Sequence, residues 1–161
     1  MESHRDDDPM IVIVDDFVGT GSTLVKGIGG FMATKGKAEI IGHYTSQGRL
    51  ICVPLYGFAD GIDKIKAKFK DIRCVVANCF GDEVQALSHT GDLFADEQER
   101  QFAEHVLLQI GRELVPNHPL GYGDMGALVC FSDNAPNNTL PIFWSAGKVG
   151  ERQWNPLFPR V

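Results

Sequence analysis

The chain has 161 residues, of which 43% are hydrophobic and 22% are charged, and its net charge is −6. The length is sufficient for a hydrophobic core, and the composition is typical of a globular protein. The acidic balance and scattered lysines argue against a broad nucleic-acid-binding face and against direct nucleic-acid binding, but leave a single nucleotide open as a ligand.

The first nine residues precede the predicted fold. They are polar and include the acidic run Asp6, Asp7 and Asp8, so we expect residues 1–9 to be a solvated, disordered lead-in. This segment is unlike a signal peptide, and no apolar run is long enough to span a membrane, which together indicate a cytoplasmic protein. Residues 10–161 contain no repeat and no flexible linker, and we expect them to form a single domain.

A short strand and a loop rich in glycine and threonine begin this domain. Residues 10–14 are apolar and mostly β-branched, as in parallel strands that are covered on both faces. Asp15 and Asp16 follow, and the loop then leads into a predicted helix over 22–34. The N–H groups at a helix start favour an anion, and the loop adds the hydroxyls of Thr20, Ser22 and Thr23. We therefore expect a ligand that has a phosphate on one side and sugar hydroxyls or a hydrated cation on the other.

Other readings of this loop are weaker. The dinucleotide fingerprint GxGxxG would need a glycine where the chain has Leu24, and the Walker A pattern would need a lysine after its last glycine. The remaining alternative is an ordinary strand-to-helix turn with an acidic N-cap.

The next segments alternate between helix and strand patterns. Gly27, Gly29 and Gly30 weaken the helix over 22–34, and we expect them to let it pack close to the sheet. Residues 38–44 fit an edge strand or a loop. Residues 49–56 are a predicted strand, in which Pro54 indicates a bulge or an edge position.

An amphipathic helix is predicted around residues 58–69, and its lysines, Lys64 among them, are interpreted as a solvated face rather than as a phosphate-binding patch. A strand over 72–80 and a long connection over 81–95 follow. The next helix runs from Asp96 to about Leu114, and Asp96 with Glu99 resembles a capping box. Alternation of strand and helix predicts an α/β fold with a mostly parallel twisted sheet flanked by helices.

The C-terminal third is predicted to contain more turn and loop. A glycine turn covers 121–124, a strand covers 127–131, and a polar loop rich in Asn and Pro leads into the apolar run 142–144. Residues 153–161 include two prolines and two large aromatic residues, and we expect an extended segment docked on the body of the domain.

The chain has four cysteines, Cys52, Cys74, Cys79 and Cys130, and none of them forms a CxxC pair. Each lies in a predicted strand. We interpret them as small buried hydrophobic residues in a reducing compartment rather than as a metal site or a disulfide.

The segment IVIVDDFVGTGSTL, residues 11–24, resembles the ribose-phosphate-binding motif of the type I phosphoribosyltransferases. The segments LGYGDMGALVCF, NAPNNTLPIFWS and WNPLFPR resemble closing motifs of the PRTase-CE group, phosphoribosyltransferase-like proteins associated with bacterial conflict systems. This resemblance implies a phosphoribosyltransferase-like fold that binds phosphoribosyl pyrophosphate (PRPP) or a ribose-5-phosphate nucleotide together with Mg²⁺. It also implies that Asp15 and Asp16 contact the ribose hydroxyls, directly or through hydrated magnesium. The same resemblance assigns the 5′-phosphate to Gly19, Thr20, Gly21, Ser22 and Thr23.

Several residues of the last third have side chains suited to a nucleobase. The ring of Tyr122 can stack on a base, and Asp124 can accept hydrogen bonds from a base or a ribose. Amides for recognition of a base edge come from Asn134, Asn137 and Asn138, and Trp144 could cover a ring. The alternative is structural: turn chemistry explains the Asn residues, and core packing explains Trp144.

The sequence departs from the enzymes of the family in three respects, one of which is that no flexible lid is evident. Gly19 stands where purine-salvage members carry an acid that is a candidate general base, and glycine can do no acid–base work. The motif begins at Ile11, so residues 1–10 cannot supply the pyrophosphate loop of the enzymes. We therefore expect a fold that is incomplete at its N-terminus and is completed by a longer chain or a partner protein, or that binds a reduced ligand. The favoured reading is a ligand-binding sensor or effector in anti-phage defence, and the alternative is an active Mg²⁺-dependent phosphoribosyltransferase. A third hypothesis is a structural C-terminal domain that keeps the loop only as a relic.

Overall fold

The computed structural model describes residues 9–132 and 134–160, which divide into two compact units. One unit ends at Phe80 and the other begins at Gly81. The lead-in predicted for residues 1–9 lies outside the described residues apart from Pro9, and a single domain over 10–161 stays a prediction. No helix of the described segments is both long and apolar enough to cross a membrane.

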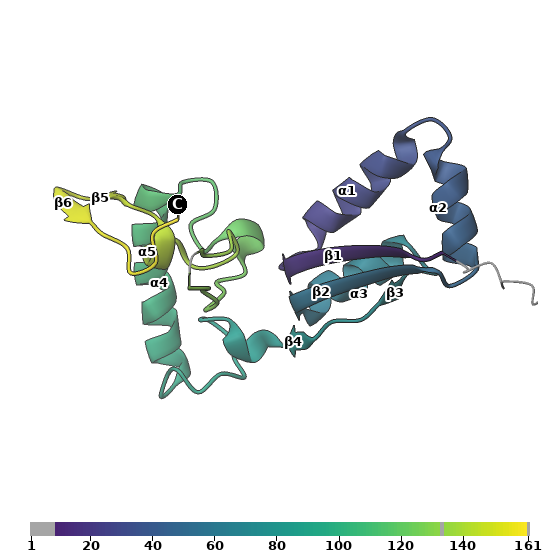
Figure 1. Cartoon of the computed structure of the whole chain (residues 1–161). Coiled ribbons are helices and arrows are strands. Elements are labelled where there is room, and N and C mark those ends of the chain that lie inside the picture. The colour runs from purple at the N-terminus through teal and green to yellow at the C-terminus, as the bar shows by residue number, and fades with distance from the viewer. Residues whose placement is uncertain (1–8, 133, 161) are drawn as a thin grey trace, which may run out of the picture. The chain divides into compact units, whose positions relative to one another are not determined.

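The N-terminal unit is a parallel sheet with three helices (Figure 1). Its elements, in chain order, are β1 (Ile11–Val18), α1 (Ser22–Ala33), α2 (Lys37–Ser46), β2 (Leu50–Phe58), α3 (Ala59–Lys68), β3 (Arg73–Cys74) and β4 (Asn78–Phe80). β2 pairs in parallel with β1 on one side and with β3 and β4 on the other. The predicted α/β class with a mostly parallel sheet is confirmed. Because the strands are parallel, the loops after β1 and β2 lie at the same end of the sheet, the carboxyl ends of the strands, where open α/β sheets bind ligands.

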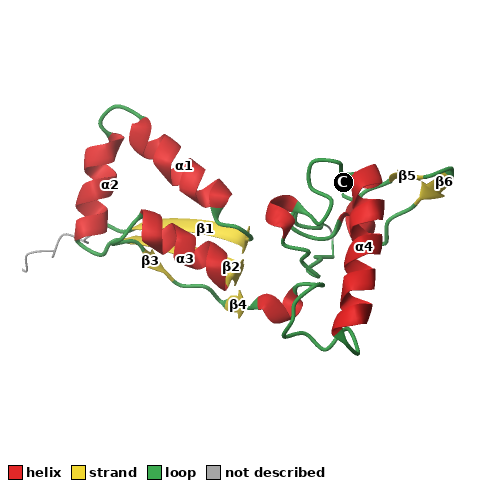
Figure 2. Ribbon diagram, turned by 180° about the vertical axis from the view of Figure 1, so that it is seen from behind, coloured by secondary structure: helices red, strands yellow, loops and turns green. Residues whose placement is uncertain are grey.

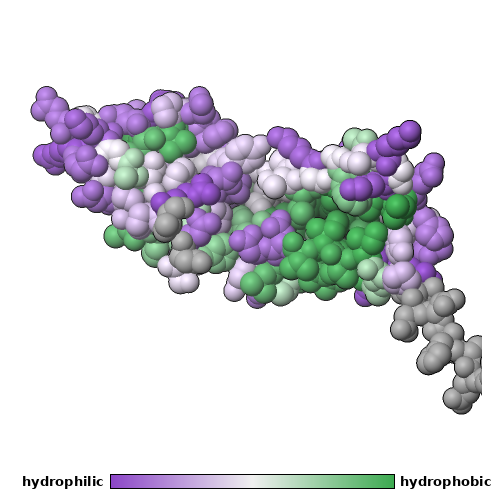
Figure 3. Space-filling model, turned by 45° about the horizontal axis from the view of Figure 1, so that its top comes forward, coloured by the Kyte–Doolittle hydropathy of each residue, from purple (hydrophilic) through white to green (hydrophobic). Residues whose placement is uncertain are grey.

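The helices of this unit cover one face of the sheet. Figure 2 shows α3 against the sheet. The core contains buried side chains from β1, β2, all three helices and the loop before β3, namely Val18, Ile28, Ile41, Leu50, Cys52, Ile62, Ile65 and Ile72. Alternate strand positions point the other way, and there Val12, Val14 and Leu55 are 53%, 76% and 51% exposed. Hydrophobic side chains gather on one surface of this unit (Figure 3). The expectation that β1 is covered on both faces is therefore wrong for the part of the chain described.

The ambiguous segment after α1 is a helix, so neither the edge strand nor the loop expected over 38–44 forms. Gly36, with φ of 79°, provides the left-handed residue from which α2 begins. Ile41 and Tyr44 are spaced by one helical turn, and both face the core. The β-branched pair Ile40 and Ile41 indicated a strand, but burial of one helical stripe against the sheet outweighs this propensity.

Pro54 lies in the central strand rather than at an edge or a bulge, which corrects the sequence prediction. Its carbonyl accepts a hydrogen bond from the N–H of Ala77 at 3.2 Å. The N–H that proline lacks would point to the same side of β2, toward the segment that contains Ala77. The predicted strand over 72–80 is interrupted at this point. Cys74 pairs with Cys52 and Asn78 pairs with Tyr56 in one register, and the ladder is broken between them.

The three glycines in α1 have no role in close packing, contrary to our expectation. A Cβ atom built at Gly27, Gly29 or Gly30 would meet no other atom within 4 Å. These residues therefore weaken the helix without bringing it closer to the sheet.

The C-terminal unit is built around one long helix. Its elements are η1 (Asp82–Val84), α4 (Glu97–Leu114), η2 (Tyr122–Asp124), α5 (Pro141–Trp144) and the antiparallel hairpin of β5 (Gly147–Val149) and β6 (Arg152–Trp154). The predicted helix and its cap are confirmed: the N–H of Glu99 donates to Asp96 Oδ1 at 2.8 Å, and the N–H of Ala95 donates to Glu99 Oε2 at 2.7 Å. The predicted turn at 121–124 is also confirmed, with positive φ at Gly121, Gly123 and Asp124. A small core forms around Ala86, Leu120 and Leu140.

The strand predicted over 127–131 is wrong. Only Ala127 makes bridges, with Gln85 and Thr139, and the residues after it join no ladder. An apolar run cannot form a strand without a neighbouring strand to accept its hydrogen bonds, and here the chain turns away within a few residues. The tail docks on α5, as predicted. The indole of Trp154 donates to the carbonyl of Ile142 at 3.0 Å, and the backbone N–H of Phe158 donates to the carbonyl of Phe143 at 2.8 Å.

Candidate functional site

The loop between β1 and α1 has open hydrogen-bond donors. Val18, the last residue of β1, is only 2% exposed and anchors the start of the loop in the core. Gly21 is the N-cap of α1 in a left-handed conformation, with φ of 70°. No side chain caps α1 and no acidic residue lies in its first turn. The N–H groups of that turn therefore remain available to an anion, which the helix dipole also favours.

A hydroxyl cluster and a lysine adjoin this helix start. The Thr20 hydroxyl donates to Ser22 Oγ at 3.0 Å, and Lys64 Nζ donates to the same oxygen at 2.9 Å. Because a hydroxyl oxygen can accept two bonds while its own proton donates a third, Ser22 can still donate to a ligand. Thr23 is exposed at the first turn of the helix. The loop thus combines backbone donors, hydroxyls and one positive charge.

Two glycines bring α3 against this loop. A Cβ atom at Gly61 would overlap the carbonyl oxygen of Gly19 and would lie 3.1 Å from the N atom of Gly21. A Cβ atom at Gly21 would overlap the carbonyl oxygen of Gly61 in turn. Both positions therefore require glycine, and the close approach places Lys64, one turn further along α3, beside Ser22.

Lys64 is the residue of this site that sequence reasoning missed. We interpreted the lysines of α3 as a solvated face, and Lys64 is exposed, but its ammonium group reaches the loop. The lysine lies 42 residues from Ser22 along the chain. Gly61, a glycine three residues before Lys64 inside a predicted helix, is the signal that could have indicated a close approach.

The two acids lie within β1 rather than after it, because the strand continues to Val18. Asp15 is half-buried, Asp16 is exposed, and the N–H of Asp16 donates to Asp15 Oδ1 at 3.1 Å. Burial raises the pKa of Asp15, and the neighbouring carboxyl of Asp16 raises it further. The pair is therefore a site of unbalanced negative charge at the same end of β1 as the loop.

These carboxylates suit a hydrated magnesium ion better than a caged one. Among residues 9–132 and 134–160, no group of three or more His, Cys, Asp or Glu side chains could hold a metal. Magnesium is commonly bound by one or two carboxylates together with waters and phosphate oxygens of a substrate. Asp15 and Asp16 therefore fit the ion if the ligand supplies further oxygens.

The residues predicted to bind a base lie in the C-terminal unit, and two of them use their polar groups within the fold. Asn138 is 4% exposed, and its amide donates to the Tyr122 carbonyl at 2.8 Å. The Trp144 indole donates to the carbonyl of Thr139 at 2.8 Å, and Arg160 lies over its ring. These bonds hold the loop after residue 131 in place, so a structural role explains the presence of both residues. A role for either residue in base binding stays a prediction.

The other predicted residues are more accessible. Asn134 and Asn137 are exposed, and Asp124 is exposed with a positive φ of 53°. The ring of Tyr122 packs edge-on against His118 at 5.0 Å between centroids. Of the residues predicted to bind a base, the structure brings Tyr122 and Asn138 into contact, through the hydrogen bond from the Asn138 amide to the Tyr122 carbonyl.

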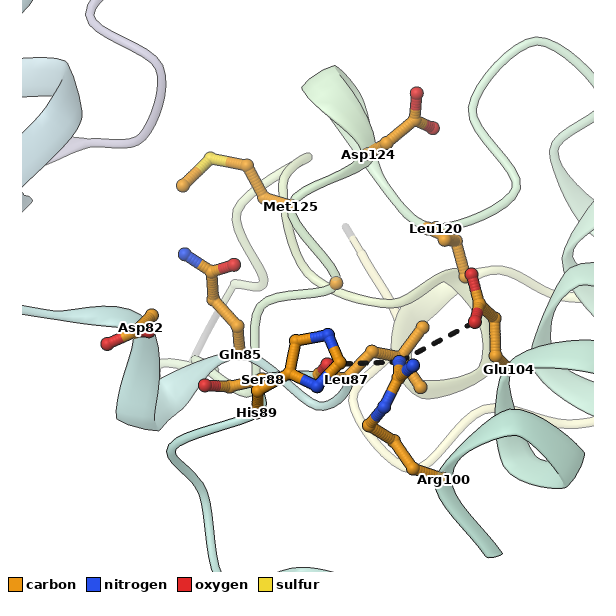
Figure 4. A pocket seen from close by; sticks show the side chains of 11 residues that line it. Asp82, Gln85, Leu87, Ser88, His89, Arg100, Glu104, Leu120, Asp124 and Met125 are labelled. Atoms are coloured by element: carbon orange, nitrogen blue, oxygen red, sulfur yellow. Dashed lines mark hydrogen bonds and ion pairs between the residues drawn. The ribbon is translucent and has the colours of Figure 1, made fainter. Parts of the chain in front are cut away.

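A pocket of about 450 Å³ lies in this unit, and of the predicted residues only Asp124 lines it (Figure 4). Arg100 supplies its positive charge, but this guanidinium already forms a bidentate pair with Glu97, at 2.6 and 2.8 Å, and lies 3.5 Å from Glu104. Figure 4 shows Arg100 between the carbonyl of Leu87 and the carboxylate of Glu104. Because its charge is neutralised within the protein, the pocket offers little attraction to a phosphate, unlike the loop before α1.

Comparison with known proteins agrees with these observations. The family model PRTase-CE matches residues 2–160. No curated protein and no solved structure matched the chain.

Proposed function

The chain belongs to the PRTase-CE family and is a phosphoribosyltransferase-like protein, and from this premise we propose that it binds PRPP or a ribose-5-phosphate nucleotide at the loop before α1. The observation that carries the proposal is the convergence on Ser22 of the Thr20 hydroxyl and the Lys64 ammonium group, beside an uncapped helix start. A phosphate at this position would receive backbone, hydroxyl and ammonium donors, and charge-assisted bonds of this kind are the strong ones.

The sugar and the metal are assigned to the acids of β1. In the proposal, Asp15 and Asp16 accept from the ribose hydroxyls or hold the water shell of Mg²⁺, whose remaining ligands are oxygens of the bound phosphates. The raised pKa of Asp15 supports this role, because a cation placed between two crowded carboxylates relieves their repulsion. When bound, the ion would neutralise the pyrophosphate group.

Binding without efficient turnover is the form of the proposal that the residues favour. Phosphoribosyl transfer needs the departing pyrophosphate to be stabilised and water to be excluded from the reacting carbon. Gly19 has no side chain to act as a base, and the phosphate donors found in the N-terminal unit are grouped around a single position at Ser22. We therefore favour a sensor or effector of a bacterial conflict system over a metabolic transferase, with a partner protein or a further segment completing the site for any catalysis.

Calorimetric titration with PRPP, with and without Mg²⁺, tests this function. We expect magnesium-dependent binding that is abolished in the Asp15→Asn/Asp16→Asn double variant and weakened in Thr20→Ala/Ser22→Ala. Asp63→Asn is the matched control, since this exposed carboxylate of α3 pairs only with Lys66 at the helix surface among the described interactions. Binding that is equal in all three variants would place the ligand elsewhere.

The alternative function, an active transferase, rests on the family resemblance. It predicts pyrophosphate release when PRPP is supplied with an acceptor base, and this release would be lost in the Asp15→Asn/Asp16→Asn variant. For the role in anti-phage defence, expression of the double variant in place of the wild-type protein should lower protection against phage infection. Unchanged protection would contradict a defence role that depends on the ligand.

A further inference from the structure

Two cysteines that are far apart in the sequence face each other in the sheet. Cys52 on β2 and Cys74 on β3 are direct partners in the parallel ladder. Neighbouring strands lie about 4.8 Å apart, which is within the range of Cα separations that a disulfide spans. Both residues are free thiols in this structure. Because paired residues of a ladder project to the same face of the sheet, the two side chains lie on one face, and each thiol shifts the pKa of the other.

The environments of the two thiols differ in a way that suits stepwise oxidation. Cys52 is fully buried, whereas Cys74 is partly accessible to solvent. The neighbouring Cys52 thiol, with a smaller effect from the positive charge of Lys66, lowers the pKa of Cys74 to about 7. The same pairing, together with burial, raises the pKa of Cys52. Cys74 is therefore the accessible, reactive thiol, and Cys52 is the neighbour positioned to resolve it.

We propose that Cys52 and Cys74 form a reversible disulfide when the protein meets a peroxide. The Cys74 thiolate attacks one peroxide oxygen, the O–O bond breaks, and water leaves after protonation, so that Cys74 becomes a sulfenic acid. The Cys52 sulfur then attacks the Cys74 sulfur, the S–O bond breaks, and a second water leaves with the Cys52 proton. Two thiols lose two electrons, and one hydrogen peroxide is reduced to two waters.

The bond would constrain the segment that carries α3. Residues 52 and 74 flank α3, whose Gly61 contacts the loop before α1 and whose Lys64 reaches Ser22. Closing a loop of this size with a disulfide restricts the unfolded chain and stabilises the folded one. This inference does not depend on the proposed function, because the disulfide is detected without any ligand. It replaces our interpretation of these two cysteines as inert core residues.

The test is a peptide map of the full chain after treatment with hydrogen peroxide, followed by alkylation without reduction. We expect one cross-linked species that joins the Cys52 and Cys74 peptides, lighter by about two hydrogens than the sum of the free peptides and reversed by dithiothreitol. The oxidised protein should melt several degrees higher than the reduced protein. Cys79→Ser and Cys130→Ser should leave the link unchanged.

A second measurement separates the two roles. In Cys52→Ala the resolving thiol is absent, so dimedone should label Cys74 as a sulfenic acid, whereas the wild-type protein should show little label. Oxidation of wild-type Cys74 to a sulfinic acid would overturn the proposal, as would a link from Cys74 to Cys79, to Cys130 or to a second chain.

Discussion

The contact between Gly61 and the loop before α1 gives a sharp test of the structure. Replacing a glycine inside a helix by alanine normally stabilises the helix by about 1 kcal/mol. At Gly61 the added methyl group would overlap the carbonyl oxygen of Gly19, which belongs to the backbone and cannot move aside as a flexible side chain would. Overpacking of this kind costs about 1–3 kcal/mol. We therefore expect Gly61→Ala to be destabilising.

Gly30→Ala is the matched control. Gly30 also lies inside a helix, but it is exposed, and a methyl group there would meet nothing within 4 Å. This variant should be stabilised by up to about 1 kcal/mol. Both variants gain helix propensity, so they should differ by the overpacking cost, about 1–3 kcal/mol in free energy of unfolding.

Urea unfolding followed by circular dichroism measures this difference, and calorimetry with PRPP measures its effect on the site. Because Gly61→Ala pushes α3 away from the loop, Lys64 should lose its hydrogen bond with Ser22, and PRPP affinity should fall by about tenfold or more. If Gly61→Ala stabilised the protein as much as Gly30→Ala, α3 and the loop would not be in contact, and the reasoning about Lys64 would fail.

Three further predictions concern charged groups. Lys64→Met should weaken PRPP binding by about tenfold, whereas Lys66→Met on the same helix should leave it unchanged; equal losses would mean that only the net charge matters. Asp15→Asn should raise the melting temperature at neutral pH while it removes magnesium-dependent binding. Because the pKa of Asp15 is raised in the fold, its ionisation costs stability as the pH rises above 3.8, and a fall in melting temperature would refute this sign. The pKa of Glu97 is lowered to about 2 by hydrogen bonds from Arg100. The contribution of Glu97 to stability should therefore be complete above pH 4.5 and lost as the pH falls toward 2. Glu97→Gln should flatten the curve of stability against pH in that window, and an unchanged curve would contradict the pairing.

Expectations from the sequence were most successful where the information is local. The β1–α1 loop is one contiguous segment in which apolar residues, acids, glycines and hydroxyls follow each other in the order that a strand, a turn and a helix require. The cap of α4 is local in the same sense, because Asp96 and Glu99 satisfy donors within one turn. Interactions over three or four residues depend little on the rest of the chain, so the order of elements and the cap are confirmed, although β1 continues to Val18 and includes the two acids.

Short apolar runs were less informative, because their periodicity cannot separate a helix from a strand. The segment 38–44 is part of α2, because a helix buries Ile41 in the core. The run 127–131 has no strand beside it and is not a strand. In both cases the deciding factor was the presence or absence of a neighbouring element, which the local sequence does not contain.

The sequence by itself determined the parallel α/β class and the position of the glycine-rich loop before α1, because hydrophobic periodicity and a contiguous motif encode both. Only the tertiary structure placed Lys64 on Ser22, set Gly61 against Gly19, and paired Cys52 with Cys74. These contacts join residues about 20 or more positions apart, and they depend on how a helix packs and how two strands align. Strand register and helix packing follow from burial of the whole core rather than from any single segment.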